Sequence, residues 1–169
     1  GGGGRVMRTQ VGIVGGGPAG LLLGHLLARD GIESVVLEAR SRAYVEQRVR
    51  AGVLEQGTVD LLKAIGLGER LEREGLVHEG LELRFDGVGH RIPLAELTGG
   101  ATITVYGQQK VVSDLTDARL AAGGALLYQA EDVTVEGLGL RYVVDREPAE
   151  GLGVPEHGTP FALGDLIQG

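Results

Sequence analysis

The amino-acid sequence predicts an α/β domain built on a Rossmann-like βαβ unit. Three observations carry this prediction. A strand at 9–14 runs into the segment Gly15-Gly16-Gly17-Pro18-Ala19-Gly20, a helix follows at 18–30, and a second strand at 34–38 ends on an acidic residue. Strand, helix and strand together span about 30 residues, which is the usual size of a βαβ crossover.

The glycine segment has the spacing Gly-x-Gly-x-x-Gly between a predicted strand and a predicted helix, and this context favours a dinucleotide site. Gly15 permits a tight turn, Gly17 allows the backbone to approach a pyrophosphate, and Gly20 lets the helix pack closely on the strand. The helix N-terminus directs unpaired N–H groups towards the phosphates. We therefore expect Gly15, Gly17, Ala19 and Gly20 to contact the cofactor.

Glu38 closes the second strand, about 20 residues beyond the glycines, where an acid accepts hydrogen bonds from the ribose hydroxyls. A carboxylate here would repel a 2′-phosphate. The motif alone does not separate FAD from NAD. A glycine-rich turn without a ligand is the alternative interpretation, because 31 of the 169 residues are glycine.

The remaining pattern predicts further helices and strands, and some of these strands are expected to be antiparallel additions to this unit. Helices are expected at 51–65, 67–74 and 108–122, and strands at 102–105, 125–128 and 132–135. Charged and apolar residues alternate over 79–86, which predicts a half-buried antiparallel strand. A turn at Asp86-Gly87 leads to a return strand at 90–93.

Three parts of the chain are distinguished by composition. Residues 1–6 precede the only methionine, Met7, and are expected to be a leader or a scar. Residues 7–144 are expected to form the N-terminal portion of the cofactor-binding domain. Residues 145–169 hold three prolines and five glycines without a clear period, which predicts an irregular tail; one interpretation of the abrupt change is a frameshift or truncated reading frame.

Composition excludes several classes of function. The chain has no cysteine, so a disulfide, a zinc–thiolate site and a thiol nucleophile are all excluded, and a cytoplasmic location is expected. The formal net charge of −7 argues against a nucleic-acid partner. No apolar run is long enough for a membrane span. The spacing of the four histidines predicts no metal site.

Several collinear blocks between Met7 and about Val144 carry a family resemblance. They are Thr9–Val11, Gly15–Gly24, Arg48–Gly57, Val59–Leu62, Glu74–Gly80 and Thr104–Gln108. In these blocks the chain resembles the class A FAD-dependent aromatic hydroxylases of the 4-hydroxybenzoate 3-monooxygenase family. The resemblance implies a glutathione-reductase-like FAD-binding fold, truncated in this chain because members of the family are considerably longer.

The resemblance also implies FAD contacts at particular positions. Glu38 would bind the adenosine ribose, the segment Arg48, Val49, Arg50, Ala51, Gly52 and Val53 would run along the pyrophosphate and flavin, and Gln108 would face the FAD. Arg50 offers a planar fork of donors to a phosphate. Without the resemblance, Arg48 and Arg50 would be interpreted as solvated surface charges.

Members of this family use NADPH to reduce FAD, and the reduced flavin reacts with oxygen to hydroxylate 4-hydroxybenzoate to 3,4-dihydroxybenzoate. The resemblance thus implies NADPH as co-substrate, a small aromatic substrate, and a homodimer in the full-length protein. No catalytic residue is assigned, and this chain alone is expected to be inactive. Two alternatives remain: a non-catalytic nucleotide-binding fragment, and an NAD-binding Rossmann module, which the Arg48–Gly57 block disfavours.

Overall fold

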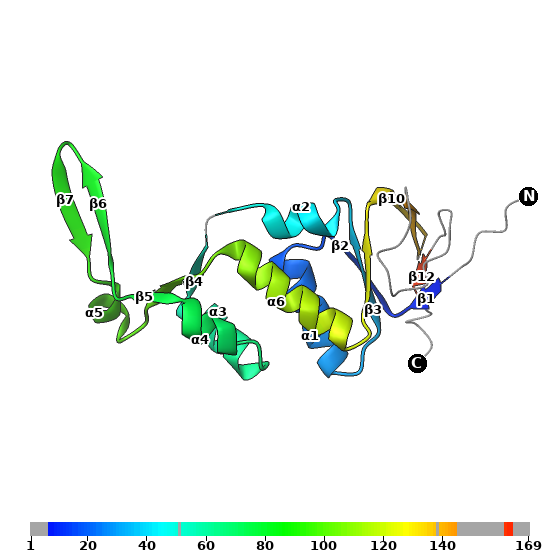
Figure 1. The fold of residues 1–169 in the computed structure, drawn as a ribbon, viewed down its shortest axis with the longest axis horizontal. Helices are drawn as coiled ribbons and strands as arrows, with labels where there is room; N and C mark the ends of the chain where they lie inside the picture. The colour runs from blue at the N-terminus through cyan, green and yellow to red at the C-terminus, as the bar shows by residue number, and fades with distance from the viewer. Residues whose placement is uncertain (1–6, 51, 138, 145–160, 164–169) are drawn as a thin grey trace, which may run out of the picture. The chain divides into compact units, whose positions relative to one another are not determined.

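The computed structural model describes residues 7–50, 52–137, 139–144 and 161–163 (Figure 1). The chain divides into two compact units: unit 1 comprises residues 1–48 and 112–169, and unit 2 comprises residues 49–111. Residues 1–6, which were predicted to be a leader or a scar, lie outside the described residues. The same holds for most of the predicted tail, at 145–160 and 164–169. Unit 1 contains the predicted βαβ unit.

A parallel sheet forms the centre of unit 1. Its strands β2 (Val11–Val14), β3 (Ser34–Glu38) and β9 (Ala125–Tyr128) lie in the order β2-β3-β9. Val35, Val36 and Leu37 are all at most 1% exposed, as expected for a central parallel strand that is covered on both faces. The Rossmann-like prediction is therefore confirmed.

Helices α1 (Pro18–Arg29) and α6 (Gln108–Ala121) lie on one face of the parallel sheet, the face towards which the Val36 side chain points. α1 begins at Pro18, and Gly31 follows its end with φ +74°, so the predicted start and stop signals are confirmed. The short helix α2 (Arg42–Gln47) was not predicted; the Ser41 hydroxyl caps it by accepting from the Tyr44 N–H at 3.3 Å.

A second sheet of four strands covers the opposite face of β3 (Figure 1). It consists of β1 (Met7–Thr9), β12 (Phe161–Leu163), β11 (Gly139–Val144) and β10 (Ala130–Glu136), in that order. A buried cluster joins the two sheets, formed by Val35, Leu37, Leu127, Ala130 and Leu140. The helices, the parallel sheet and this second sheet are the three layers of unit 1.

One expectation for unit 1 was wrong. The predicted strand 9–14 is two strands that join different sheets, with a bend at Gln10. At the bend, the Gln10 side chain accepts a hydrogen bond from the Glu33 N–H at 2.8 Å. Within the tail predicted to be irregular, Phe161–Leu163 forms β12 and pairs with β1 and β11. A three-residue strand has no period that the sequence pattern could reveal.

Unit 2 combines short helices with two antiparallel sheets. Helices α3 (Gln56–Ala64), α4 (Glu69–Glu74) and α5 (Leu94–Thr98) accompany a sheet of β4 (Val53–Glu55), β8 (Ile103–Val105) and β5 (Leu76–His78) in the order β4-β8-β5. Strands β6 (Leu81–Phe85) and β7 (Val88–Ile92) form a separate hairpin. The additional antiparallel strands that the sequence predicts are thus present.

The predicted helix 51–65 is partly wrong. Residues 53–55 form β4, which pairs with β8, and α3 begins only at Gln56. The carbonyl of Gly52 accepts the Tyr106 N–H at 2.8 Å, so the segment enters the sheet before it turns into the helix. Val53 and Leu54 fit an apolar helix face and a short strand equally well, which is why the period alone misled.

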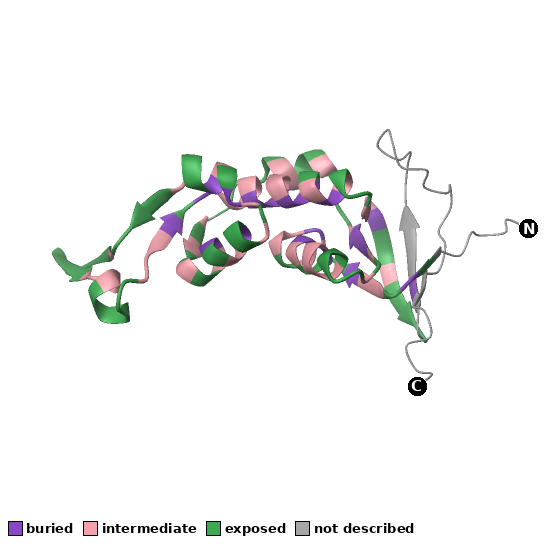
Figure 2. Cartoon of the chain, turned by 90° about the horizontal axis from the view of Figure 1, so that it is seen from below, coloured by how far each residue is buried: buried purple, intermediate pink, exposed green. Residues whose placement is uncertain are grey.

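The β6–β7 hairpin turns at Asp86 and Gly87, both with positive φ, as predicted and as a two-residue type I′ turn requires. Its predicted burial is wrong. Every residue of β6 is exposed (Figure 2), although Leu81, Leu83 and Phe85 alternate with charged residues. Phe85 stacks on His90 within the hairpin, with ring centroids 4.0 Å apart. The alternation therefore marks an amphipathic hairpin that unit 2 does not cover.

The double substitution Leu81→Lys, Leu83→Lys is expected to reduce self-association of the purified chain without lowering its melting temperature. The two side chains are 37% and 50% exposed, and contiguous exposed apolar surface promotes association. Sedimentation velocity and a thermal melt would measure the two effects. A clear drop in melting temperature would contradict the exposure of these residues.

Candidate functional site

The glycine turn after β2 has the geometry that its residues predict. Gly15 has φ +111°, a conformation that L side chains rarely adopt, and its N–H donates to the Leu37 carbonyl at 2.7 Å. A Cβ on Gly20 would lie 2.0 Å from the Gly15 carbonyl oxygen and 3.1 Å from Ile13 Cγ2. The close packing of α1 on β2 therefore depends on Gly20 being glycine.

The start of α1 is open towards solvent. Gly17 is the N-cap residue and makes no capping bond through a side chain, and a Cβ placed on it would meet nothing within 4 Å. Ala19, the other predicted contact here, is exposed. The first N–H groups of a helix have no partner within it and carry a partial positive charge. The turn thus presents free donors where a phosphate could approach without steric hindrance.

The Glu38 carboxylate is held against this turn by two backbone donors. Its Oε2 accepts from the Gly16 N–H and its Oε1 from the Arg40 N–H, each at 2.8 Å. The contact is close, because a Cβ on Gly16 would lie 2.9 Å from Glu38 Cβ. A carboxylate has lone pairs for about four hydrogen bonds. Both oxygens of Glu38 can therefore accept further donors from a bound molecule.

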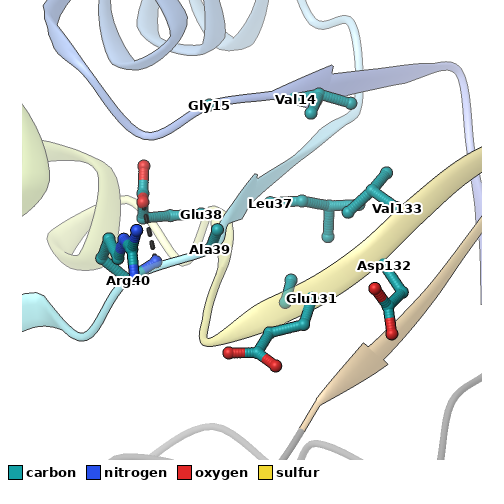
Figure 3. A pocket seen from close by; sticks show the side chains of 10 residues that line it. Val14, Gly15, Leu37, Glu38, Ala39, Arg40, Glu131, Asp132 and Val133 are labelled. Atoms are coloured by element: carbon teal, nitrogen blue, oxygen red, sulfur yellow. Dashed lines mark hydrogen bonds between the residues drawn. The ribbon is translucent and has the colours of Figure 1, made fainter.

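A cavity of about 450 Å³ opens at the carboxyl ends of β2 and β3 (Figure 3). It is lined by Val14, Gly15, Leu37, Glu38, Ala39, Arg40, Ala130, Glu131, Asp132 and Val133. Ligands of open α/β sheets bind at this edge, and the volume lies in the range of small-molecule sites. The glycine turn, the predicted acid and the cavity are thus neighbours in unit 1.

The charges that line the cavity are mainly negative. Glu38, Glu131 and Asp132 are acidic, and Arg40 is the one basic residue in the lining. Such a lining favours a neutral group with hydrogen-bond donors, such as hydroxyls or an amine, over a phosphate. The N-terminus of α1 has the opposite character. The two neighbouring regions are therefore suited to the two ends of a nucleotide.

The segment that the resemblance assigns to the cofactor begins at the end of α2. Arg48 is the C-cap residue, and its guanidinium lies 5.7 Å from the centroid of the Tyr44 ring, over which Arg40 also lies at 5.6 Å. Val49 is 79% exposed and Arg50 is also exposed. Ala51 lies outside the described residues.

The other predicted contacts lie within unit 2. A Cβ on Gly52 would be 2.3 Å from the Tyr106 carbonyl oxygen and 2.5 Å from Gly107 Cα. Val53 is 55% exposed, and Gln108 is the half-buried first residue of α6. The structure thus brings Gly52 next to the segment that leads into Gln108. It does so through a backbone contact that leaves no room for a side chain at position 52.

Sequence reasoning missed three parts of this site. Gly16 and Arg40 supply the N–H groups that hold Glu38, and Ala130–Val133 form a wall of the cavity. The strand predicted at 125–128 was the available signal for the wall, because residues after a parallel strand lie at its carboxyl end. Among the residues with assigned positions, no helix could cross a membrane and no cluster of His, Asp and Glu could hold a metal ion.

Comparison with known proteins identifies the family. The FAD binding domain family matches residues 8–138. The p-hydroxybenzoate hydroxylase of Acinetobacter baylyi is 48% identical over 131 residues, which cover 78% of this chain and 32% of that protein. The 6-methylpretetramide 4-monooxygenase of Streptomyces rimosus is 40% identical over 80 residues, which cover 47% of this chain and 19% of that protein. The chain thus spans a third or less of the length of these relatives.

A solved structure shows the same fold. The p-nitrophenol 4-monooxygenase PnpA from Pseudomonas putida superimposes with a TM-score of 0.69 at 19% sequence identity, covering 93% of this chain and 39% of PnpA. The family match extends over most of the chain, from β1 to β10, and includes the glycine turn and Glu38. The chain therefore belongs to the FAD-binding domain family of flavoprotein monooxygenases, and p-hydroxybenzoate hydroxylase is a close homologue.

Proposed function

We propose that this chain is the N-terminal, FAD-binding part of an NADPH-dependent monooxygenase that hydroxylates 4-hydroxybenzoate to 3,4-dihydroxybenzoate. The identity of 48% to p-hydroxybenzoate hydroxylase supports the substrate and the reaction. The observation that carries cofactor binding is the Glu38 carboxylate, held by the Gly16 N–H at 2.8 Å beside the cavity.

The residues of unit 1 fit the adenosine and pyrophosphate end of FAD. The ribose hydroxyls would donate to Glu38, the pyrophosphate would lie at the N-terminus of α1, and the adenine would enter the cavity. The negative lining at Glu131 and Asp132 is compatible with an adenine, which is neutral and carries an amino donor. Gly15, Gly17, Ala19 and Gly20 are the proposed contacts of the turn.

Further contacts are proposed for Arg48, Val49, Arg50, Ala51, Gly52, Val53 and Gln108. They are supported by the collinear match with the hydroxylase, which includes these positions. Arg50 is exposed, so its planar guanidinium is accessible to a phosphate. Gly52 allows its backbone to approach the backbone of Tyr106 and Gly107 closely, since a side chain at position 52 would collide with these two residues.

FAD, when bound, would carry electrons from NADPH to oxygen, and this cofactor chemistry would hydroxylate the aromatic ring. The residues of this chain bind and orient the cofactor, and we assign none of them to catalysis. We place the aromatic-substrate pocket in the part of the relatives that has no counterpart here, so this chain alone would be inactive. The boundary near Val144, the cytoplasmic location and a homodimer of the complete enzyme belong to the same proposal.

Glu38→Gln is expected to weaken FAD binding about tenfold, because a neutral amide loses about 1.4 kcal/mol of charge-assisted hydrogen bonding. The amide NH₂ of the introduced glutamine would also face the backbone N–H of Gly16 or of Arg40, and two donors cannot form a hydrogen bond with each other. Titration of the purified chain with FAD, followed by quenching of flavin fluorescence, would measure the dissociation constant. Glu33→Gln is the matched control, because Glu33 is exposed in the same unit. Equal affinity in Glu38→Gln and wild type would overturn the proposed ribose contact.

A second experiment separates catalysis from cofactor binding alone. The FAD-loaded chain is mixed with NADPH, and absorbance at the NADPH band is followed with and without 4-hydroxybenzoate. We expect FAD to bind and NADPH oxidation to stay at its unstimulated rate. Stimulation by 4-hydroxybenzoate would contradict the inactivity of this chain, and a colourless protein that binds NADH instead would overturn the assignment of FAD.

A further inference from the structure

A polar cluster in unit 2 joins the end of α4 to the start of α6. The Glu74 carboxylate accepts from Lys110 Nζ at 2.8 Å and from Arg70 Nε at 3.2 Å through Oε2, and from Arg73 at 3.3 Å through Oε1. Three cations from two helices thus fix the orientation of one carboxylate. Lys110 is the member that comes from α6.

Lys110 also contacts the segment that precedes α6. Its Nζ lies 5.5 Å from the centroid of the Tyr106 ring, within the range of a cation–π interaction. Tyr106 is 2% exposed, and its N–H donates to the Gly52 carbonyl at 2.8 Å. Lys110 therefore lies between Glu74 on one side and a buried aromatic ring, fixed to Gly52, on the other.

Gln108 lies inside the stretch of chain that these contacts fix. The Lys110 N–H donates to the Gly107 carbonyl at 2.9 Å and closes the first turn of α6 around Gln108. The turn is attached at Tyr106 through Gly52 and at Lys110 through Glu74. A rotation of this turn that redirected Gln108 would break one of the two attachments.

The Glu74 carboxylate stays charged well below neutral pH. The hydrogen bond from Lys110, opposed by burial and supported by Arg70, lowers the pKa of Glu74 to about 2. The side chains of Glu74 and Lys110 are 31% and 33% exposed, and ion pairs with such access to solvent contribute little to global stability. An effect of this pair should therefore be found in local geometry and not in the melting temperature.

We propose that Glu74 and Lys110 are positioning residues that hold Gln108 in the orientation in which it contacts FAD. This inference rests on the proposed function, in which Gln108 is a cofactor contact. The two residues act through Tyr106 and the first turn of α6 and do not touch the cofactor themselves.

The test measures the FAD dissociation constant and the melting temperature of the purified chain for five variants. Lys110→Met and Glu74→Gln break the pair, Lys110→Arg retains it, and Gln108→Ala removes the proposed contact. Lys63→Met is the matched control, because it breaks the Lys63–Glu72 ion pair of 2.7 Å in the same unit. We expect Lys110→Met to weaken FAD binding about fivefold, Lys110→Arg to restore it, and Lys63→Met to leave it unchanged, with similar melting temperatures throughout.

The double variant Gln108→Ala, Lys110→Met identifies the route of the effect. If Lys110 acts through Gln108, the double variant binds FAD no more weakly than Gln108→Ala alone, because the two effects are not additive. Fully additive losses, or equal losses in Lys110→Met and Lys63→Met, would overturn the positioning role while the Gln108 contact stands. Unchanged affinity in Gln108→Ala would remove the contact itself, and the positioning role with it.

Discussion

Gly20→Ala is expected to abolish folding of unit 1 and, with it, FAD binding. An added Cβ would lie 2.0 Å from the Gly15 carbonyl oxygen, and an obstacle made of backbone cannot rotate away as a flexible side chain does. Either α1 must move away from β2 or the turn must rearrange. Both responses break the packing of the buried Leu21, so we expect a loss of more than about 4 kcal/mol in the free energy of unfolding. Far-UV circular dichroism in a urea titration would measure this loss.

Two other glycines provide the controls for Gly20→Ala. Gly57 lies in α3 with nothing within 4 Å of an added Cβ, so Gly57→Ala should be neutral or stabilise by up to about 1 kcal/mol. Gly17→Ala should fold, because the space around its Cβ position is open, yet bind FAD more weakly. A Gly20→Ala variant that melts cooperatively at the wild-type temperature would refute the close contact between α1 and β2.

Arg119→Met is expected to destabilise unit 1 by about 3 kcal/mol. Arg119 is 3% exposed, and its guanidinium donates to the Ser34 carbonyl at 2.7 Å and to the Ala125 carbonyl at 2.8 and 3.0 Å. It therefore ties α6 to the beginnings of β3 and β9. Burial lowers the pKa of Arg119, but an arginine stays protonated. Methionine fills much of the volume but leaves the two carbonyls without these donors.

Thermal unfolding would measure the effect of Arg119→Met as a drop of about 10 °C in melting temperature. Arg119→Lys should fall between methionine and wild type, since an ammonium lacks the planar fork that reaches both carbonyls. Arg84→Met is the control, because the Arg84 side chain is 81% exposed and its loss should be nearly neutral. Equal melting temperatures for Arg119→Met and Arg84→Met would show that the buried hydrogen bonds contribute nothing.

The βαβ unit was predictable because its signals are local. The glycine spacing, Pro18 at the helix start and the buried run Val35–Leu37 each act within a few residues. Strand β12 depends on pairing with β1, which lies far away in the chain, and no local pattern encodes that pairing. Helices α2 and α5 contain no buried residue, so no apolar face marks them in the sequence, whereas the equally short α4 buries Leu71.

The sequence predicted which residues form the candidate site, but it did not predict the hydrogen bonds between them. The sequence placed Glu38 beside the glycine turn, because parallel strands end at the same edge of a sheet. The bond from the Gly16 N–H depends on the backbone angles of the turn, with φ +111° at Gly15, which a spacing does not specify. The cavity wall at Ala130–Val133 depends on Gln129, whose φ of +57° redirects the chain from β9 into β10.

The hydrogen bond between Gly16 and Glu38 has a consequence for the kinetics of binding. It forms within the protein itself, so the turn does not need to be ordered by the incoming molecule. Binding sites that are organised in advance lose less conformational entropy on association, and this raises affinity. Association with an adenine nucleotide should accordingly follow a single concentration-dependent phase, without a slow first-order step in which the loop rearranges.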